Sequence, residues 1–407
     1  MADGSPTGSD PRAAAADELA RALATADGQR TLRDLQRLSL LASPAEPAPE
    51  APAERADQEA PRPISIWTPR DEGGETVWSR PPRLPLGDHY ADVPEIRARK
   101  TGRRICFFGE SAAAGYLYAP YRTPAKVLAA QLKQVAPDIE VIDLARTNET
   151  LAPLIETVRA ARQLSPDLLV IYAGNNWSLL ETPEVSPYPP GVRGRQSYAA
   201  MLRGGGVLEP ARRARERLAG LASAALAEIA EIAAGLPVIL VVPEVNLADW
   251  ETREPAPWLP GDRTARWYAA YGRARAELAA GRFADAESAA WEMVDLDGGT
   301  GPIPFRLLAA ALRGQGREEA ARDAAISEVD SVHYPLLALL AAPQATTLAR
   351  EVLSAATASR AAAGWSAVDL RRLFADWTGS PLPGRRLFLD YCHLTVEGME
   401  VAMAAVA

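Results

Sequence analysis

The chain has 407 residues, 48% of them hydrophobic, which is enough to bury a core larger than that of one small domain. Its formal net charge of −8 argues against nucleic-acid binding, because neutralising phosphates requires clustered lysines and arginines. With only two cysteines, no disulfide framework is expected, and a reducing, cytoplasmic location is predicted. Neither a signal peptide nor an apolar stretch of membrane-spanning length is visible, so no membrane contact is expected.

The first hundred residues divide into three predicted segments. Residues 1–42 carry leucines at helical spacing and are predicted to form an N-terminal helical segment. Residues 43–63 are rich in proline, alanine and glutamate, a composition that favours an extended linker. Residues 64–100 are expected to be an irregular lead-in.

Short apolar runs alternate with helical patterns between residues 101 and 261. The runs are rich in β-branched residues and apolar on both faces, as buried parallel strands are. They cover 103–109, 139–145, 166–174 and 236–246. A last strand and helix are expected in 364–407. This alternation predicts an α/β fold, a doubly wound, flavodoxin-like parallel sheet of about five strands flanked by helices.

Residues 262–363 interrupt the alternation with helix after helix. "GRFADAESAAWEMVD" and "GREEAARDAAISEVD" begin 35 residues apart, at Gly281 and Gly316, and share alanines at packing positions, Ala286 and Ala321. The pattern resembles degenerate tetratricopeptide repeats, in which small residues let paired helices approach closely. We therefore expect a repeat-like helical insertion in the α/β domain, with a plain helical insertion as the alternative. This insertion, or the N-terminal helix, could bind a protein partner.

Polar residues suited to nucleophilic catalysis follow the predicted strands. Ser111 comes after the first run, Asn176 after the third, and Asp390 and His393 stand near the end of the chain. Functional groups in parallel sheets gather beyond the carboxyl ends of the strands. A serine hydroxyl becomes a useful nucleophile when an imidazole accepts its proton and a carboxylate orients that imidazole. The sequence therefore predicts that these side chains converge.

Three segments carry a resemblance to a known family. "FFGES", "YAGNNW" and "DYCHLT" resemble blocks one, three and five of the SGNH (GDSL-like) hydrolases, whereas the G-x-S-x-G elbow of α/β-hydrolases is absent around Ser111. The resemblance covers about 103–180, 236–250 and 365–406, and a helical insertion before the last block is similar to one bacterial branch of the family. It implies two parts of one hydrolase core, within 101–261 and 364–407.

The resemblance also implies a role for each residue. Ser111 would be the nucleophile, His393 the general base and acid, and Asp390 the residue that orients His393. Asn176 and the backbone N–H of Ser111 would bind the oxyanion. The implied activity is that of a serine esterase or thioesterase on a small-molecule or carrier-bound acyl group, without metal or cofactor. An acyltransferase using the same acyl-serine, and a non-catalytic helical-repeat interaction protein on a degenerate hydrolase core, are the alternatives.

The sequence departs from the family pattern at two places. Glu110 stands where aspartate is usual, a change we expect to be tolerated because this acid is not the nucleophile. The second block, "DLARTNETL", has no glycine to donate a third N–H to the oxyanion. Arg146 could instead meet an anionic substrate group, and Asn148 could donate from its backbone or side chain. Trp177 either lines the pocket mouth or packs in the core.

The other histidines and the cysteines are not expected to be catalytic. His89 is predicted to lie in an exposed loop, and His333 to be a packing or surface residue. Cys106 falls inside the first strand, and Cys392 adjoins His393 but should point elsewhere, so thiol catalysis is disfavoured. No cluster has metal-ligand spacing.

Overall fold

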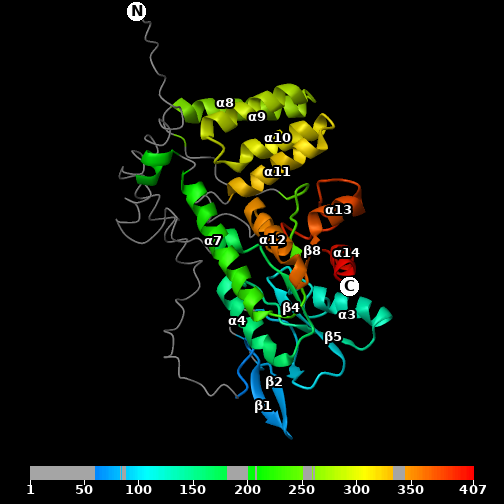
Figure 1. Cartoon of the computed structure of the whole chain (residues 1–407). Helices are drawn as coiled ribbons and strands as arrows, with labels where there is room; N and C mark the ends of the chain where they lie inside the picture. Colours follow the sequence, from blue (N-terminus) through cyan, green and yellow to red (C-terminus); the bar gives the residue numbers. More distant parts are fainter. Residues whose placement is uncertain are drawn as a thin grey trace, which may run out of the picture. The chain divides into compact units, whose positions relative to one another are not determined.

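The structure, a computed structural model, describes residues 60–82, 84, 89–180, 200–206, 209–250, 259, 262–332 and 344–407. The predicted N-terminal helical segment, nearly all of the predicted linker, and His333 lie outside the described residues. The chain divides into two compact units, one containing the helices from α8 to α11, the other containing both sheets and the helices around them (Figure 1). Each unit is described by itself below.

A sheet of five parallel strands forms the centre of the larger unit, with the order β5-β4-β6-β7-β8. Its strands are β4 (Arg103–Gly109), β5 (Ile139–Asp143), β6 (Leu168–Tyr172), β7 (Val238–Val242) and β8 (Trp365–Asp369). Each lies within a run predicted to be a strand. The predicted α/β class, with about five parallel strands flanked by helices, is confirmed at this level.

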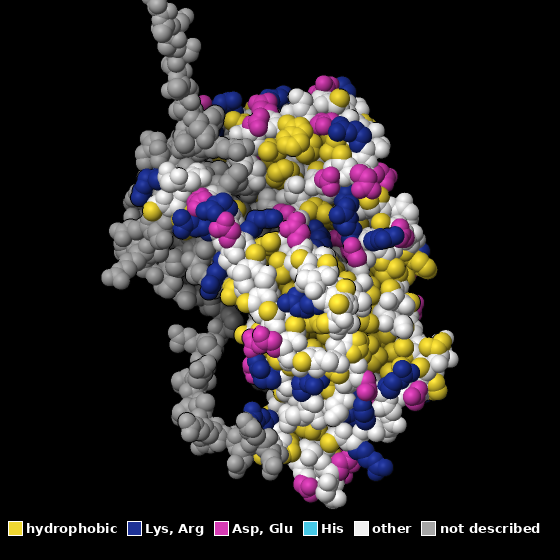
Figure 2. All heavy atoms as spheres, viewed as in Figure 1, with side chains coloured by type: hydrophobic (Ala, Val, Ile, Leu, Met, Phe, Trp, Pro, Cys, Tyr) yellow, Lys and Arg dark blue, Asp and Glu magenta, His cyan; other side chains and the backbone are white. Residues whose placement is uncertain are grey.

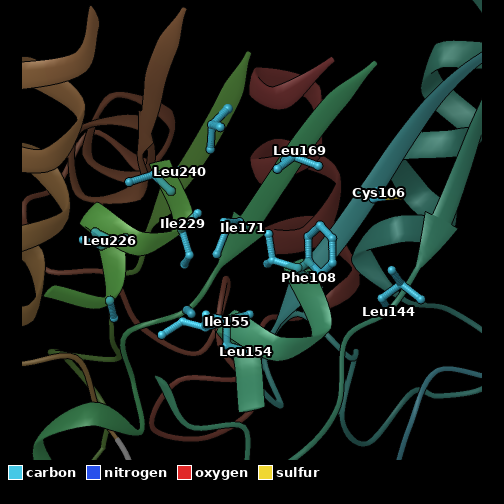
Figure 3. Close-up of a cluster of buried hydrophobic side chains, with 14 of the residues drawn as sticks. Cys106, Phe108, Leu144, Leu154, Ile155, Leu169, Ile171, Leu226, Ile229 and Leu240 are labelled. Carbon is cyan, nitrogen blue, oxygen red and sulfur yellow. The ribbon is translucent and has the colours of Figure 1, made fainter. Parts of the chain in front are cut away.

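Helices cover both faces of this sheet. One face packs against α4 (Leu151–Ala161), α7 (Glu209–Ile232) and α12 (Thr347–Arg360), and the other against α3 (Pro124–Val135), α13 (Leu370–Thr378) and α14 (Val396–Val406). Side chains alternate along each strand, so that Phe108 enters the first core and Phe107 the second. Figure 3 shows the first core, where Phe108 and Ile171 of the sheet lie near Leu154 of α4.

Residues 64–100 contain an antiparallel sheet, where the sequence analysis expected irregular structure. It consists of β1 (Thr68–Glu72), β2 (Glu75–Ser79) and β3 (Glu95–Arg97), in that order. The side chains of β1 are mostly exposed and polar, so this strand has no apolar pattern to detect. The usable signal was Gly73-Gly74, a pair at positive φ that connects β1 to β2 as a two-residue hairpin turn.

The smaller unit contains four consecutive described helices. These are α8 (Asp262–Ala279), α9 (Phe283–Asp297), α10 (Pro302–Gly314) and α11 (Glu318–Val332). The sequence analysis extended the helical insertion to residue 363, but α12 belongs to the unit that contains the sheet. Its Ala349 and Leu353 are buried in the core beside α4 and α7. Amphipathic periodicity marks a helix without saying which unit covers its apolar face.

Charges of both signs alternate on the described surface. Figure 2 shows lysine and arginine side chains interspersed with aspartate and glutamate over the face in view. On α7, for example, Arg212 and Glu209 form an ion pair with 2.6 Å between nitrogen and oxygen. Within the described ranges, every helix is too short or too polar to cross a membrane.

Candidate active site

The turn after β4 holds Ser111 at the carboxyl end of the sheet. Gly109 ends the strand at a φ of 150°, and a Cβ there would lie 2.0 Å from the carbonyl oxygen of Tyr172 on neighbouring β6. Only glycine allows the two strands to approach so closely. Turns follow from residue 111 to 121, and α3 begins at Pro124, capped by the Thr123 hydroxyl. Ser111 is therefore placed by a strand end that only glycine permits and by a turn, with no helix directly behind it.

Ser111, His393 and Asp390 form one chain of hydrogen bonds. His393 Nε2 lies 2.9 Å from Ser111 Oγ, and His393 Nδ1 lies 2.7 Å from Asp390 Oδ2. Asp390 Oδ1 accepts the backbone N–H groups of Cys392 and His393, at 3.0 and 2.9 Å. A carboxylate on Nδ1 leaves Nε2 free to accept the serine proton. The sequence-predicted nucleophile, base and orienting acid are thus in contact.

Asp390 is kept ionised by its hydrogen bonds. Burial alone would raise the pKa of its carboxyl, but the bonds and charge of His393 and the N–H of Cys392 outweigh burial and lower it below the ordinary value. An ionised carboxylate can stabilise the imidazolium that forms when His393 takes up a proton.

Asn176 lies in the loop that follows β6, beside the turn that carries Ser111. It is buried, and its side-chain Nδ2 donates to the backbone oxygen of Glu149 at 3.0 Å. A side-chain amide carries two N–H donors, so a second N–H remains for another acceptor. Across the described ranges, the backbone N–H of Ser111 has no hydrogen-bond acceptor. Both predicted oxyanion donors therefore retain an N–H for a ligand.

Glu110 fixes the Asn176 loop, a role that the sequence analysis missed. Its carboxylate accepts three backbone N–H groups, from Gly174 at 2.9 Å, Asn175 at 2.8 Å and Asn176 at 3.1 Å. Burial raises the pKa of Glu110 to about 8, although the three donors act in the opposite direction. Glu110 thus ties the turn that carries Ser111 to the loop that carries Asn176.

Glu110→Gln should flatten the pH dependence of stability. As pH rises from about 5 to about 8, an unfolded Glu110 loses its proton while the folded one keeps it, so the free energy of unfolding falls. Each unit of pKa difference corresponds to about 1.4 kcal/mol. Asp143, Glu149 and Asp297 have raised pKa values as well, which gives the wild type a further downward slope. Denaturant unfolding at the two pH values measures the difference.

The same Glu→Gln change at Glu156, whose side chain is 71% exposed on α4, serves as the control and should keep the wild-type slope. Equal slopes in Glu110→Gln and the wild type would refute the titration of Glu110 in this range.

The second block, "DLARTNETL", has no glycine but contains a residue with a left-handed backbone conformation. Asn148 adopts a φ of 54°, a left-handed conformation that asparagine tolerates better than most residues. Its side chain is exposed. Arg146 is already engaged, because its Nε lies 3.0 Å from Glu149 Oε1 and its Nη1 2.7 Å from the Tyr90 hydroxyl. The Arg146 guanidinium already binds these two groups, so an anionic substrate group would compete with a buried carboxyl for it.

The remaining predicted residues are distributed between core and surface. Trp177 is 1% exposed and belongs to the hydrophobic core, so its packing role prevails over a place at the pocket mouth. His89 is exposed, as expected. Both cysteines are free and buried, and burial raises the pKa of Cys106 to about 12 and that of Cys392 well above its ordinary value. Neither thiol is a competent nucleophile.

Asn246, in the loop after β7, is a second residue that the sequence analysis missed. Its Nδ2 donates to the backbone oxygen of Asp390 at 3.1 Å, and its N–H donates to that of Tyr391 at 3.0 Å. These bonds hold the loop that presents Asp390 and His393 to Ser111. The sequence offered one signal for Asn246, its position as a polar residue just after the apolar core of a predicted strand.

One set of possible metal ligands occurs in the described part of the chain. Ligand atoms of Asp390, Cys392 and His393 lie within 4.8 Å of one another. Both ring nitrogens of His393 are already hydrogen-bonded, and burial keeps the Cys392 thiol protonated, whereas a metal binds the thiolate. This donor set suits proton transfer better than metal binding.

Comparison of the chain with models of known protein families, with curated proteins and with solved structures finds no match.

Proposed function

We propose that the chain is an SGNH-type serine hydrolase, an esterase or thioesterase that acts on a small-molecule or carrier-bound acyl group. The observation that carries this proposal is the hydrogen-bond chain from Asp390 through His393 to Ser111 Oγ, whose last step joins residues 282 positions apart. Three residue types in the order needed for proton transfer meet at the carboxyl end of a parallel sheet, where such sites gather.

The first half of the reaction forms an acyl-enzyme. Ser111 Oγ attacks the carbonyl carbon of the ester while His393 Nε2, 2.9 Å away, takes the hydroxyl proton. The tetrahedral intermediate carries its negative charge on the former carbonyl oxygen, which accepts N–H groups from the Ser111 backbone and the Asn176 side chain. The carbon–oxygen or carbon–sulfur bond then breaks, and the leaving alcohol or thiol receives the proton from His393.

The second half releases the acyl group. His393 Nε2 takes a proton from water as the water oxygen attacks the acyl-serine carbonyl. When this second tetrahedral intermediate collapses, the bond to Ser111 Oγ breaks, the free acid leaves, and the serine oxygen regains a proton from His393. Asp390 stays ionised throughout and stabilises the imidazolium in both halves.

The finer architecture that we propose is a doubly wound, flavodoxin-like sheet with a tetratricopeptide-like insertion. The strand order β5-β4-β6-β7-β8 and the two helix-covered faces support the first part. Gly281 and Gly316 at φ values of 71° and 73°, followed by the fully buried Ala286 and Ala321, support the second. A cytoplasmic location is part of the proposal, supported by two free cysteines, and a protein partner for the helical region stays a prediction.

Turnover of p-nitrophenyl acetate tests the function and separates it from its alternatives. Hydrolase activity predicts release of p-nitrophenol and acetate at a rate that does not depend on added butanol or butylamine. Release that requires one of these acceptors, with formation of the acetylated acceptor beyond the amount formed without the protein, would replace the hydrolase with a transferase. No turnover of several p-nitrophenyl esters by the folded protein would favour a non-catalytic helical-repeat interaction protein.

A further inference from the structure

A row of aromatic rings runs through the catalytic histidine. The Tyr116 ring lies 4.9 Å from the His393 ring between centroids, and the Tyr391 ring lies 5.4 Å from it. His89 extends the row beyond Tyr116 at 6.4 Å, and Trp250 extends it beyond Tyr391 at 5.4 Å. We refer to His89, Tyr116, His393, Tyr391 and Trp250 as the aromatic row.

Tyr116 is fixed beside the reacting atoms and remains accessible. Its backbone N–H donates to the backbone oxygen of Ser111 at 3.0 Å, which ties the two residues to one turn. The residue is 40% exposed, so part of its surface faces solvent. Because His393 Nε2 bonds Ser111 Oγ, rings that contact the imidazole border the space that an acyl-serine occupies.

The backbone conformation that places Tyr116 is unfavourable. The next residue, Leu117, has a φ of 76°, in the left-handed region that bulky residues avoid, and it is 62% exposed. Because Leu117 is largely exposed, burial of its side chain contributes little stability to offset this strain. Strained backbone conformations of this kind concentrate at functional sites. The position of the neighbouring tyrosine is therefore maintained at a cost to stability.

The ionised and polar groups around the site disfavour an anionic ligand. Asp390, whose pKa is lowered, carries a negative charge at the His393 ring. Arg146, a cation in the segment that follows β5, is paired with Glu149 and lies over the Tyr90 ring, at 5.4 Å from the ring centroid. A neutral ligand with a π-face matches this environment, because aromatic rings gain edge-to-face or offset-stacked contacts in addition to the burial of their apolar area.

We propose that Tyr116 and Tyr391 form a subsite that binds the planar aromatic group of a neutral ester's acyl part. This inference rests on the proposed serine hydrolase function. The aromatic ring of the acyl group would lie against Tyr116, on the side of His393 next to Ser111 Oγ, and its carbonyl would stay within reach of the nucleophile. Saturated rings of similar size would fill the space without the ring–ring contacts.

Two esters with one leaving group test the subsite, p-nitrophenyl phenylacetate and p-nitrophenyl cyclohexylacetate. They expose similar apolar area and differ in the planar π-system. The wild type should have a kcat/KM about fivefold to tenfold higher for the phenyl ester, once each value is corrected for spontaneous hydrolysis. Tyr116→Leu should abolish that preference, and Tyr116→Phe should retain it, because the ring and not the hydroxyl provides the contact.

Tyr121→Leu is the matched control, since Tyr121 belongs to the same run of turns and is 90% exposed. It should keep the wild-type preference. Equal kcat/KM values of the wild type for the two esters, or a preference that persists in Tyr116→Leu, would overturn the subsite while leaving the hydrolase standing. Absence of turnover of both esters, together with no covalent labelling of Ser111, would instead overturn the proposed function and the subsite with it.

Discussion

Asp390→Asn should lower kcat by about 10⁴-fold and leave KM nearly unchanged. The asparagine Oδ1 can still accept the backbone N–H groups of Cys392 and His393, so the loop keeps its shape. Its Nδ2 would donate to His393 Nδ1, which forces the proton onto Nε2, and an Nε2–H cannot accept the proton of Ser111. Steady-state kinetics on a p-nitrophenyl ester measure the effect.

The control for this variant is Asp369→Asn, because Asp369 Oδ1 also accepts a nearby backbone N–H, that of Arg371, at the start of α13. It should hydrolyse the ester like the wild type. If Asp390→Asn lost less than about tenfold in kcat, the orienting role of Asp390 would be refuted.

Asn176→Ala should lower kcat by roughly 10² to 10³-fold, the usual cost of removing one oxyanion donor. The Asn176 side chain can donate one N–H to Glu149 and a second to the oxyanion, and alanine removes both. Because the charge on the oxygen develops only in the transition state, KM should change little. The ratio of kcat to KM effects distinguishes this donor role from general damage to the loop.

Asn175→Ala provides the comparison. Asn175 is as deeply buried, and its Oδ1 accepts the N–H of Ala345 at 3.0 Å, so the variant loses stability through a contact on the other side of the loop. The folded fraction of Asn175→Ala should keep its kcat. A similar kcat loss in both variants would mean that Asn176 supports the loop and donates nothing to the oxyanion.

The strands of the central sheet could be predicted because buried strands appear in the sequence as short apolar runs. β4 was predicted from Arg103 to Gly109 and is observed over the same residues, since an apolar run bounded by charges and a glycine has one plausible length. β1 could not be predicted in this way, because its polar side chains face solvent. Likewise, α12 was assigned to the insertion, since the pattern of a helix does not identify the surface that it covers.

The residues of the hydrogen-bond chain could be predicted because their types are rare or distinctive. Histidine occurs three times. His333 and His393 both follow an aspartate at a spacing of three, but His333 lies in the predicted helical insertion, whereas His393 follows the last predicted strand. The roles of the residues that surround these three could not be predicted, since they depend on contacts between distant segments. Glu110 reaches the loop after β6, and Asn246 reaches the loop that carries Asp390. Neither contact leaves a periodic or local signal in the sequence.

The aromatic row was missed for the same reason. Tyr116 and Tyr391 are far apart in the sequence, and each one alone is an ordinary tyrosine. Only the turn after Ser111 and the loop before His393 bring the two rings to one imidazole.

Covalent labelling with a fluorophosphonate tests the central claim most directly, because the reagent phosphonylates a serine only when a base has activated it. The full-length protein should be labelled, peptide mass spectrometry should place the label on Ser111, and Ser111→Ala should abolish labelling while staying folded. A folded wild-type protein that takes up no label, or one labelled equally in Ser111→Ala, would contradict the assignment of Ser111 as an activated nucleophile.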